Sequence, residues 1–325
     1  MNRGFWDTLP TPFFVLAPMY DVTDVAFRQV VAQCGRPDVF FTEFVSTDGL
    51  MSAGRERLAH HLLKEPHESP LVAQVFGAKP EKFRETAAYI QELGFDGLDI
   101  NMGCPDKNII KGGSCAALFK TPELARDIIL AAKEGAGNMP VSVKIRIGDT
   151  KVDWEHWVAT LLEAKPAALS VHLRTRKEMS KVPAHWELMP DIVSLIHRCI
   201  RPEDRPLIIG NGDVLTLREA KEKVTTSGCD GVMIGRGVFQ NPWVFAEDEP
   251  TSHSLEEKAA LLLTHARLYE HHFGGKKPFE PLKRFYKIYI NGVPQAAELR
   301  EELYKAGTAE EIETILTQHK LLPSP

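Results

Sequence analysis

The stretch GLDINMGCP, residues 97–105, runs from an apolar segment into a turn rich in glycine and proline. Its first four residues predict a buried strand, because a short apolar run bounded by turn residues is typical of a parallel sheet. The turn then presents an amide, Asn101, and a thiol, Cys104, at the carboxyl end of that strand. A free cysteine is most often a small buried hydrophobe, so the remainder of the chain must decide between packing and catalysis for Cys104.

Short apolar runs alternate with longer amphipathic segments through most of the chain. This alternation predicts parallel β-α-β units, and eight strands within about 250 residues are typical of a (β/α)8 TIM barrel. A doubly wound sheet is the alternative, but its first strand would be followed by a G-x-G-x-x-G loop, where this chain has APMY at 17–20. The eight predicted strands cover residues 13–16, 39–44, 71–76, 97–100, 141–147, 168–172, 207–209 and 231–234.

The composition changes near residues 248–252, and every later segment has a helical pattern. Two sequences that fit helix capping boxes, beginning at Ser254 and Thr308, fall in this part of the chain. We therefore predict two domains, a (β/α)8 barrel over 1–247 and a small all-helical domain over 248–325.

The 325-residue chain has the composition of an ordinary globular protein, with 43% hydrophobic and 26% charged residues. No apolar run reaches membrane-spanning length, and the first seven residues do not resemble a secretory signal, so we expect a cytoplasmic protein. Its five cysteines include no C-x-x-C pair, so we expect neither a metal site nor disulfides. The histidine pairs at 60–61 and 271–272 are predicted to be exposed. A net charge of −5 gives no general basic field, so contact with nucleic acid would depend on a local patch.

Almost every predicted strand ends in a polar residue within an otherwise apolar sequence. Burial with a satisfied hydrogen bond would explain any one of them. The carboxyl ends of barrel strands meet on one rim, however, so the convergence of these residues predicts a functional site. They are Gln74, Asn101, Lys144, Arg146, His172, Arg174, Asn211, Asp213 and Arg236.

Two loops that contain glycine, IGNGD at 209–213 and MIGRG at 233–237, follow the last two predicted strands. Many barrels bind a phosphate at these loops through backbone N–H groups. Glycine lets the backbone approach an anion closely, and Arg236 adds a fork of donors. Tight turns without a ligand are the alternative explanation.

Lys144 lies in the middle of the apolar run VSVKIRI, residues 141–147. A lysine there needs a partner, because an unpaired buried charge is costly. A reduced flavin carries negative charge that such a lysine would stabilise. A structural ion pair with Asp99 is the alternative.

Five motifs occur in an order that resembles the tRNA-dihydrouridine synthase family. The resemblance is close over residues 13–245 and rests on architecture alone over the rest. The motifs are NMGCP at 101–105, KIR at 144–146, HLRTR at 172–176, GNGD at 210–213 and VMIGRG at 232–237, and APM at 17–19 fits as well.

The resemblance implies FMN as the cofactor, NADPH as the reductant and a uridine of tRNA as the substrate. It implies that Cys104 is the proton donor and that Asn101 helps to hold the target uracil. By the same analogy, the residues that line FMN are Pro18, Met19, Tyr20, Gln74, Lys144, His172, Asn211, Gly212, Asp213, Gly235 and Arg236.

Three positions depart from the family's pattern. Tyr20-Asp21 stands where small residues are usual, and Leu173 stands where the family usually has glycine. Cys115, in the glycine-rich stretch after the catalytic loop, offers a second thiol, but Cys104 is favoured because it sits directly at the strand end.

The segment KKPFEPLKRFYK, residues 276–287, has five basic residues and one acidic residue, with aromatic residues between them. This pattern suits RNA contacts, although a solvated helix face is the commoner explanation of such a run. We therefore expect the helical domain to bind tRNA, with Arg174 and Arg176 forming part of a second basic cluster at the barrel rim. The predicted substrate contacts are Asn101, Arg174, Arg176, Lys283 and Arg284.

We hypothesise that the protein, acting as a monomer, reduces the C5–C6 bond of a tRNA uridine to 5,6-dihydrouridine. Hydride would pass from flavin N5 to C6, and Cys104 would protonate C5 as a general acid, since a thiol of ordinary pKa is protonated at neutral pH. A flavin barrel reductase acting on a small pyrimidine or enone is one alternative, and a non-catalytic RNA-binding barrel is another.

Overall fold

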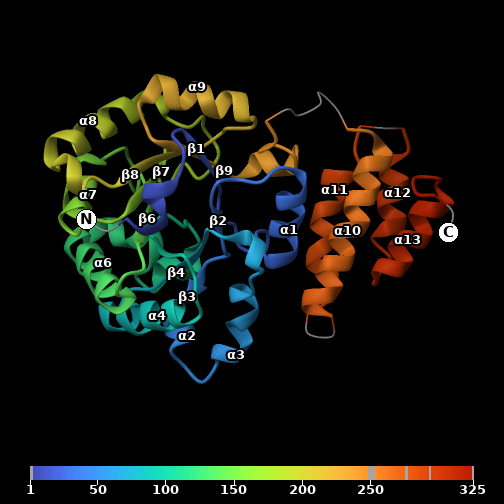
Figure 1. Cartoon of the computed structure of the whole chain (residues 1–325), viewed down its shortest axis with the longest axis horizontal. Coiled ribbons are helices and arrows are strands. Elements are labelled where there is room, and N and C mark those ends of the chain that lie inside the picture. Colours follow the sequence, from blue (N-terminus) through green and yellow to red (C-terminus); the bar gives the residue numbers. More distant parts are fainter. Residues whose placement is uncertain (1–2, 248–252, 275–276, 293, 324–325) are drawn as a thin grey trace.

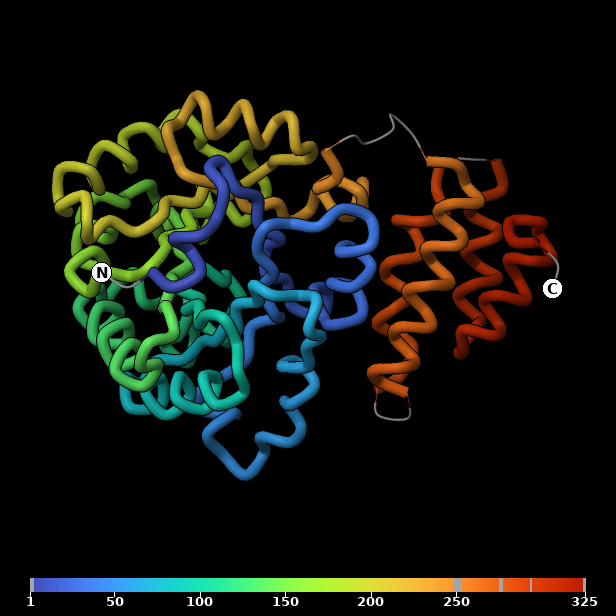
Figure 2. Tube along the Cα trace, viewed as in Figure 1, coloured from blue at the N-terminus to red at the C-terminus, as the bar shows by residue number. Residues whose placement is uncertain are grey.

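The computed structural model describes residues 3–247, 253–274, 277–292 and 294–323. Figure 1 shows a barrel of strands ringed by helices, with a separate group of helices beside it. The trace in Figure 2 follows the chain from the barrel into these helices, which are coloured orange to red. The residues at the predicted domain boundary, 248–252, lie outside the described part, so the boundary stays a prediction.

The described strands form one sheet in which every pairing is parallel. The order is β1-β9-β8-β7-β6-β5-β4-β2, and β3 pairs with the later part of β4. The strands are β1 (Phe13–Leu16), β2 (Phe40–Phe41), β3 (Val45–Ser46), β4 (Leu71–Phe76), β5 (Gly97–Asn101), β6 (Val141–Arg146), β7 (Ala168–His172), β8 (Leu207–Asn211) and β9 (Gly231–Ile234).

The segment predicted as one strand at 39–44 consists of two short strands, β2 and β3, which pair with successive parts of β4. Val39 forms a bridge with Val15, and its carbonyl accepts a hydrogen bond of 3.1 Å from the N–H of Leu16. These contacts join β1, at one edge of the sheet, to the segment just before β2, at the other edge. Eight strand positions therefore make a nearly closed barrel, which confirms the predicted (β/α)8 TIM fold.

Amphipathic helices cover the outside of this barrel. In the segment 122–136 the buried residues Ala125, Ile128, Ile129 and Ala132 recur at helical spacing, which gives the helix an apolar stripe facing the sheet. The longer outer helices are α1 (Val25–Cys34), α4 (Pro80–Glu92), α6 (Pro122–Ala136), α7 (Glu155–Glu163), α8 (Met189–Cys199) and α9 (Leu217–Ser227). The shorter ones are α2 (Thr47–Leu50), α3 (Arg55–Leu58) and α5 (Lys107–Lys111).

Apolar side chains fill the interior of the barrel at the amino ends of its strands. Phe13, Val15, Phe41 and Val72 form one cluster there with Trp6, which comes from the short helix at Gly4–Thr8. Because this end is packed, the barrel is open to a ligand only at the carboxyl ends of its strands.

The helical domain contains α10 (Leu255–Phe273), α11 (Tyr286–Tyr289), α12 (Ala296–Leu303) and α13 (Ala309–Gln318). Ser254 and Glu257 make the predicted capping box, with hydrogen bonds of 3.1 and 2.8 Å. Thr308 caps the N–H of Glu311 at 3.2 Å, but the carboxylate of Glu311 accepts from Gly307 instead of closing a second box.

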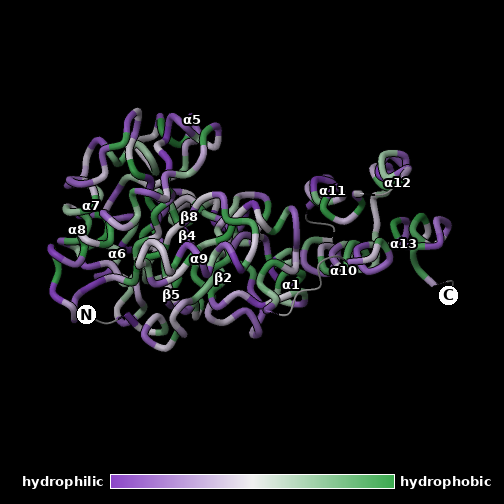
Figure 3. Tube along the Cα trace, turned by 90° about the horizontal axis from the view of Figure 1, so that it is seen from above, coloured by the Kyte–Doolittle hydropathy of each residue, from purple (hydrophilic) through white to green (hydrophobic). Residues whose placement is uncertain are grey.

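Helix α10 lies against α1 of the barrel, as the view from above in Figure 3 also shows. Aromatic rings join the two bodies: the ring of Phe27 on α1 lies 4.8 Å from that of Phe285 and 5.5 Å from that of His265. Contact between apolar surfaces of this kind fixes the helical domain to the barrel on the side of β1.

Two of the histidines predicted to be exposed lie in polar contacts inside the structure. His61 is 5% exposed, and its Nδ1 lies 3.0 Å from the carboxylate of the fully buried Glu43. His272 contacts the side-chain amide of Gln29 at 2.6 Å, between α10 and α1. The prediction of exposure was wrong for these two because adjacent helical residues face different directions, and one of each pair turns inward.

None of the described helices is long and apolar enough to cross a membrane.

A buried ion pair ties α1 to the loop before β4. The guanidinium of Arg28 donates to the carboxylate of Glu68 at 2.8 Å, and neither side chain is exposed. Arg28→Ala leaves the carboxylate buried without its partner, so we expect the free energy of unfolding to fall by about 3–5 kcal/mol. Denaturant titration measures this change.

The matched control is Arg267→Ala, since Arg267 forms an exposed pair with Glu313. We expect it to change the free energy of unfolding by at most about 1 kcal/mol. Equal changes in the free energy of unfolding would show that the buried pair stabilises the fold no more than the exposed pair does.

Candidate active site

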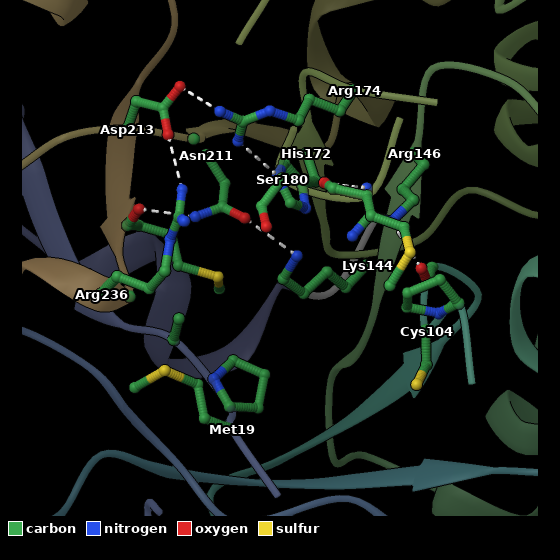
Figure 4. Close-up of a pocket in the computed structure, with 18 of the residues that line it drawn as sticks. Met19, Cys104, Lys144, Arg146, His172, Arg174, Ser180, Asn211, Asp213 and Arg236 are labelled. Carbon is green, nitrogen blue, oxygen red and sulfur yellow. Dashed lines mark hydrogen bonds and ion pairs between the residues drawn. The ribbon is translucent and has the colours of Figure 1, made fainter. Parts of the chain in front are cut away.

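A cavity of about 330 Å³ opens at the carboxyl ends of the strands (Figure 4). Sequence-predicted residues supply much of its lining, from strands β5 to β9 and from the turn after β1. Those that line it are Pro18, Met19, Asn101, Cys104, Lys144, Arg146, His172, Arg174, Asn211, Gly212, Asp213, Gly235 and Arg236.

Five predicted site residues do not line the cavity: Tyr20, Gln74, Arg176, Lys283 and Arg284. Gln74 is fully buried, whereas Tyr20 follows the lining residue Met19 and has a half-exposed side chain. Leu173, which departs from the family's pattern, is also fully buried and is not a lining residue.

Lys144 on β6 points into the cavity toward β8, where its Nζ donates to Oδ1 of Asn211 at 3.0 Å. Inward-facing residues of alternate barrel strands share a layer, which is why these two meet across β7. Asn211 is held in turn by its Nδ2, which donates to the carbonyl of Met233 at 2.8 Å. Burial and, to a smaller extent, the charge of the nearby Arg146 lower the pKa of Lys144 to about 8.

Asp99, the alternative partner for Lys144, is hydrogen-bonded to other residues. Its carboxylate accepts hydrogen bonds from Ser142 at 2.6 Å and from Gln74 at 2.7 Å, and burial raises its pKa to about 6. Within the part of the chain that the structure describes, no carboxylate lies within 4 Å of Nζ of Lys144. Lys144 therefore has no ion-pair partner among the described residues, and a bound anion would balance its charge.

The side chain of Asn101 fixes the turn that carries Cys104. Its Oδ1 accepts hydrogen bonds from the backbone N–H groups of Gly103 and Cys104, at 3.0 and 2.9 Å. Its Nδ2 donates to Gln74 at 2.9 Å. The side-chain oxygen of Asn101 is thus occupied, as is one of the two hydrogens on its Nδ2. The second Nδ2 hydrogen is the donor that Asn101 can offer to a ligand.

Arg146 holds the same turn from its other side. Its guanidinium donates to the carbonyl of Gly103 at 2.7 Å, and also to the carbonyls of Thr175 and Met179 at 3.1 and 3.2 Å. It therefore joins the turn after β5 to the loop after β7. Arg146 was predicted only as one of the polar residues at the strand ends, and these bonds to backbone carbonyls give it a positioning role.

Cys104 is half-buried at the cavity wall, and its pKa is lowered to about 7. A hydrogen bond from the Cys115 thiol is the main cause, and the N–H of Asp106 and the charge of Arg146 act in the same direction. We expected an ordinary thiol pKa, so the structure corrects that expectation. Cys115 is fully buried, and its backbone lies in the left-handed region with φ +55°. Burial keeps the pKa of its thiol well above the usual range.

Two arginines and a carboxylate lie on the side of the cavity formed by β7, β8 and β9. Asp213 pairs with Arg174 and also with Arg236, the latter at 2.7 Å. Arg174 Nη1 lies 3.3 Å from Nε2 of His172, and burial lowers the pKa of that histidine well below its usual range. His172 is therefore neutral, and the cations around it give this side of the cavity affinity for an anion.

The predicted RNA contacts outside the cavity are already engaged in ion pairs. Arg176 pairs with Asp149, and Lys283 pairs with Glu280 at 2.9 Å. Arg284 reaches from the helical domain to the carbonyl of Asp21 on the barrel, at 3.0 Å.

Two of the three aromatic residues of the segment 276–287 do not suit the role predicted for them. Phe285 and Tyr286 are buried in the helical domain, so they pack against protein and cannot stack on bases. Lys276 lies outside the described residues. The basic residues of this segment remain a prediction for tRNA contact.

Several lining residues escaped the sequence analysis, among them Phe44, Met179 and Ser180. Phe44 follows a broken strand, and the other two lie in the loop after β7, so neither periodicity nor a motif marks them. No group of three or more potential metal ligands occurs among the described residues.

The residues of the cavity fit a flavin that carries a phosphate. Lys144 lacks a carboxylate, the arginines at β7 and β9 favour an anion, and Met19 and Met233 supply apolar surface for a ring system. The glycine at 212 has φ +136°, and a Cβ there would lie 2.7 Å from Ala184, so only glycine is accommodated at this part of the wall.

A family model described as Dihydrouridine synthase (Dus) matches residues 15–322. A protein of Bacillus subtilis named "Probable tRNA-dihydrouridine synthase 2" is 46% identical over 321 residues, 97% of this chain and 96% of the relative. A "Probable tRNA-dihydrouridine synthase" of Staphylococcus epidermidis is 45% identical with the same coverage. The chain belongs to the dihydrouridine synthase family.

Solved structures resemble the chain in fold. A variant of NCR from Zymomonas mobilis matches with a TM-score of 0.51 and 15% identity, over 83% of this chain and 99% of that one. At this identity the match supports the barrel architecture alone.

The contact between Cys115 and Cys104 makes a prediction for thiol reactivity. Cys115→Ala removes the main hydrogen bond that stabilises the Cys104 thiolate, so the pKa of Cys104 should rise from about 7 toward that of an ordinary thiol. Alkylation by iodoacetamide as a function of pH, with Cys104 read by peptide mass spectrometry, measures the midpoint.

Cys199→Ser is the control, because Cys199 is exposed and should leave the midpoint of Cys104 unchanged. A midpoint that does not move in Cys115→Ala would contradict the role assigned to the second thiol.

Proposed function

We propose that this enzyme reduces the C5–C6 bond of a uridine in tRNA, using FMN and NADPH. One observation carries the proposal: the partly buried Lys144, without an ion-pair partner among the described residues, shares a cavity with the ionisable thiol of Cys104. A cation for an anionic cofactor and an acid for the substrate are the two groups that this reduction needs. The names of relatives that match nearly the whole chain support the same reaction.

The residues that would hold FMN are those of the cavity near β1 and from β6 to β9. Bound FMN supplies a hydride, which it obtains from NADPH. Lys144 would meet negative charge on the reduced ring system, and the neutral His172 would accept or donate a hydrogen bond without adding charge. The set is Pro18, Met19, Lys144, His172, Asn211, Gly212, Asp213, Gly235 and Arg236.

The target base must leave the RNA stack to reach a cavity inside the barrel mouth. Asn101 would orient the uracil with its free amide hydrogen, while its carbonyl oxygen holds the turn. When a hydride adds to C6, negative charge develops at C5 and O4. The Cys104 S–H donates its proton to C5, and the resulting thiolate takes a proton from solvent. The net change at the base is the addition of one hydride and one proton.

The tRNA body would be held by Arg174, Arg176, Lys283 and Arg284. Three of these lie outside the cavity, so they would contact the backbone and not the base. Each already has a protein partner, and phosphate would compete with those partners. Affinity for tRNA should therefore fall as salt concentration rises.

The deciding experiment reduces the purified holoenzyme with NADPH without oxygen and then adds an unmodified tRNA transcript. Return of the oxidised flavin absorbance, with dihydrouridine in the RNA, supports the proposal. Flavin that stays reduced with tRNA but is reoxidised by free uracil or a small enone would identify a small-molecule reductase. Protein that neither contains nor binds FMN would overturn the proposal.

Cys104→Ala removes the proton donor. We expect the reoxidation of reduced enzyme by tRNA to slow by about 10²- to 10⁴-fold, with FMN binding and reduction by NADPH retained. In the wild-type enzyme the same step should slow above pH 7, because Cys104 must be protonated and its pKa is about 7. Stopped-flow absorbance at several pH values measures both effects. Normal turnover of Cys104→Ala together with an inactive Cys115→Ala would assign the acid to the other thiol.

Lys144→Met removes the positive charge next to the cofactor. We expect kcat to fall by about 10²- to 10³-fold and the midpoint potential of the flavin to become more negative, since the reduced form loses its stabilising cation. Spectroelectrochemical titration measures the potential. Lys133→Met is the control, because Lys133 is a half-buried lysine of an outer helix bonded to backbone carbonyls. A potential that is equal in both variants would contradict the role given to Lys144.

A further inference from the structure

The most exposed large aromatic residue of the described chain stands at the mouth of the cavity. Tyr20 is 51% exposed and directly follows Met19, which lines the cavity. One side of its ring is supported by Phe44, at 5.4 Å between centroids, and by His61, at 5.5 Å. Phe44 itself lines the cavity, so the three rings, here called the aromatic ledge, continue the cavity wall outward.

Hydrogen bonds hold the turn that carries Tyr20. The carbonyl of Met19 accepts from the N–H groups of Val22 and Thr23, at 3.1 and 3.0 Å. The N–H of Asp21, a residue with φ +55°, donates to Glu43 at 2.6 Å. The tyrosine is therefore presented on a fixed turn.

Glu43 connects the turn to the rest of the ledge. Its carboxylate is fully buried, and its second oxygen contacts Nδ1 of His61 at 3.0 Å. One buried charge thus positions both the turn and the ring that supports Tyr20. The ring of Tyr20 is therefore held in water, although burial of its apolar surface would be favourable. An aromatic ring held exposed in this way indicates a binding surface for a ligand.

We propose that the aromatic ledge stacks the RNA base next to the target uridine. When one nucleotide leaves the stack for the cavity, its neighbour loses a stacking partner, and an exposed aromatic ring at the mouth replaces it. Because every base has a π-face, this contact does not require a particular neighbour. The inference rests on the proposed function, since it takes RNA as the substrate.

A cation beside the ledge suits a nucleic acid as the occupant. Arg284 donates to the carbonyl of Asp21 at 3.0 Å and lies 3.5 Å from the Asp21 carboxylate, with which a phosphate would compete. Its side chain is 42% exposed. A phosphate of the stacked nucleotide would find this guanidinium at the base of the turn. Ring and cation together match the two parts of a nucleotide, and they come from the two domains.

The test compares Tyr20→Ala with Tyr20→Phe in tRNA binding by the holoenzyme. Loss of stacking should raise the Kd of Tyr20→Ala by about 5- to 150-fold, while the phenyl ring of Tyr20→Phe should keep it within about twofold. Tyr304→Ala, which removes an exposed tyrosine of the helical domain, is the control and should leave Kd unchanged.

A second measurement identifies the base. The modified uridine is first mapped, and tRNAs are then made with an abasic nucleotide on either side of it. The wild-type enzyme should lose affinity for one of these tRNAs, and Tyr20→Ala should lose no more on the same tRNA, because the contact is already absent. If Tyr20→Ala keeps the wild-type Kd, or still loses affinity for both abasic tRNAs, the inference is overturned.

Other results separate the inference from the proposed function. If Tyr20→Ala slows reduction by NADPH and leaves the Kd for tRNA unchanged, the ledge holds the dinucleotide, and the inference alone is overturned. If the wild-type enzyme fails to bind or reduce any tRNA, the proposed function is overturned together with the inference.

Discussion

The parallel register of the barrel is the constraint on which the site depends. Asn101 of β5 is paired with Lys144 of β6, and two residues further along, Arg146 is paired with His172 of β7. His172 is paired in turn with Asn211 of β8. These residues are far apart in sequence, yet the pairing places them at two adjacent levels of the barrel, Asn101 with Lys144 and then Arg146 with His172 and Asn211. A shift of one residue in any of these pairings would turn the side chain from the cavity toward the outer helices.

The sequence allowed the barrel and most of the cavity wall to be predicted, because strands of one type share a polarity and their ends must meet. It could not show which polar residues face the ligand and which support them. Gln74 lies at a strand end, as Lys144 does, but it is bonded to Asp99 and Asn101 below the cavity. Phe285 and Tyr286 were predicted to contact RNA, but both are buried. A short sequence pattern does not distinguish an aromatic residue in a small core from one on a surface.

The turn after β5 shows how much of an active site serves geometry. Asn101 fixes it from within through two backbone N–H groups, and Arg146 fixes it from the side through a carbonyl. The turn presents the thiol of Cys104 to the cavity, and the ionisation of this thiol is governed mainly by a second thiol eleven residues later in the chain. Cys115 was considered as a rival of Cys104, whereas the structure makes it a neighbour that stabilises the thiolate.

Asp213 places one negative charge between two positive ones. Its carboxylate pairs with the guanidinium groups of both Arg174 and Arg236, so the three side chains together keep an excess of positive charge. The two ion pairs also cross-link the loops that follow β7, β8 and β9 at one side of the cavity. The chain's own side chains therefore order this wall, and the positive charge that remains favours an anion there.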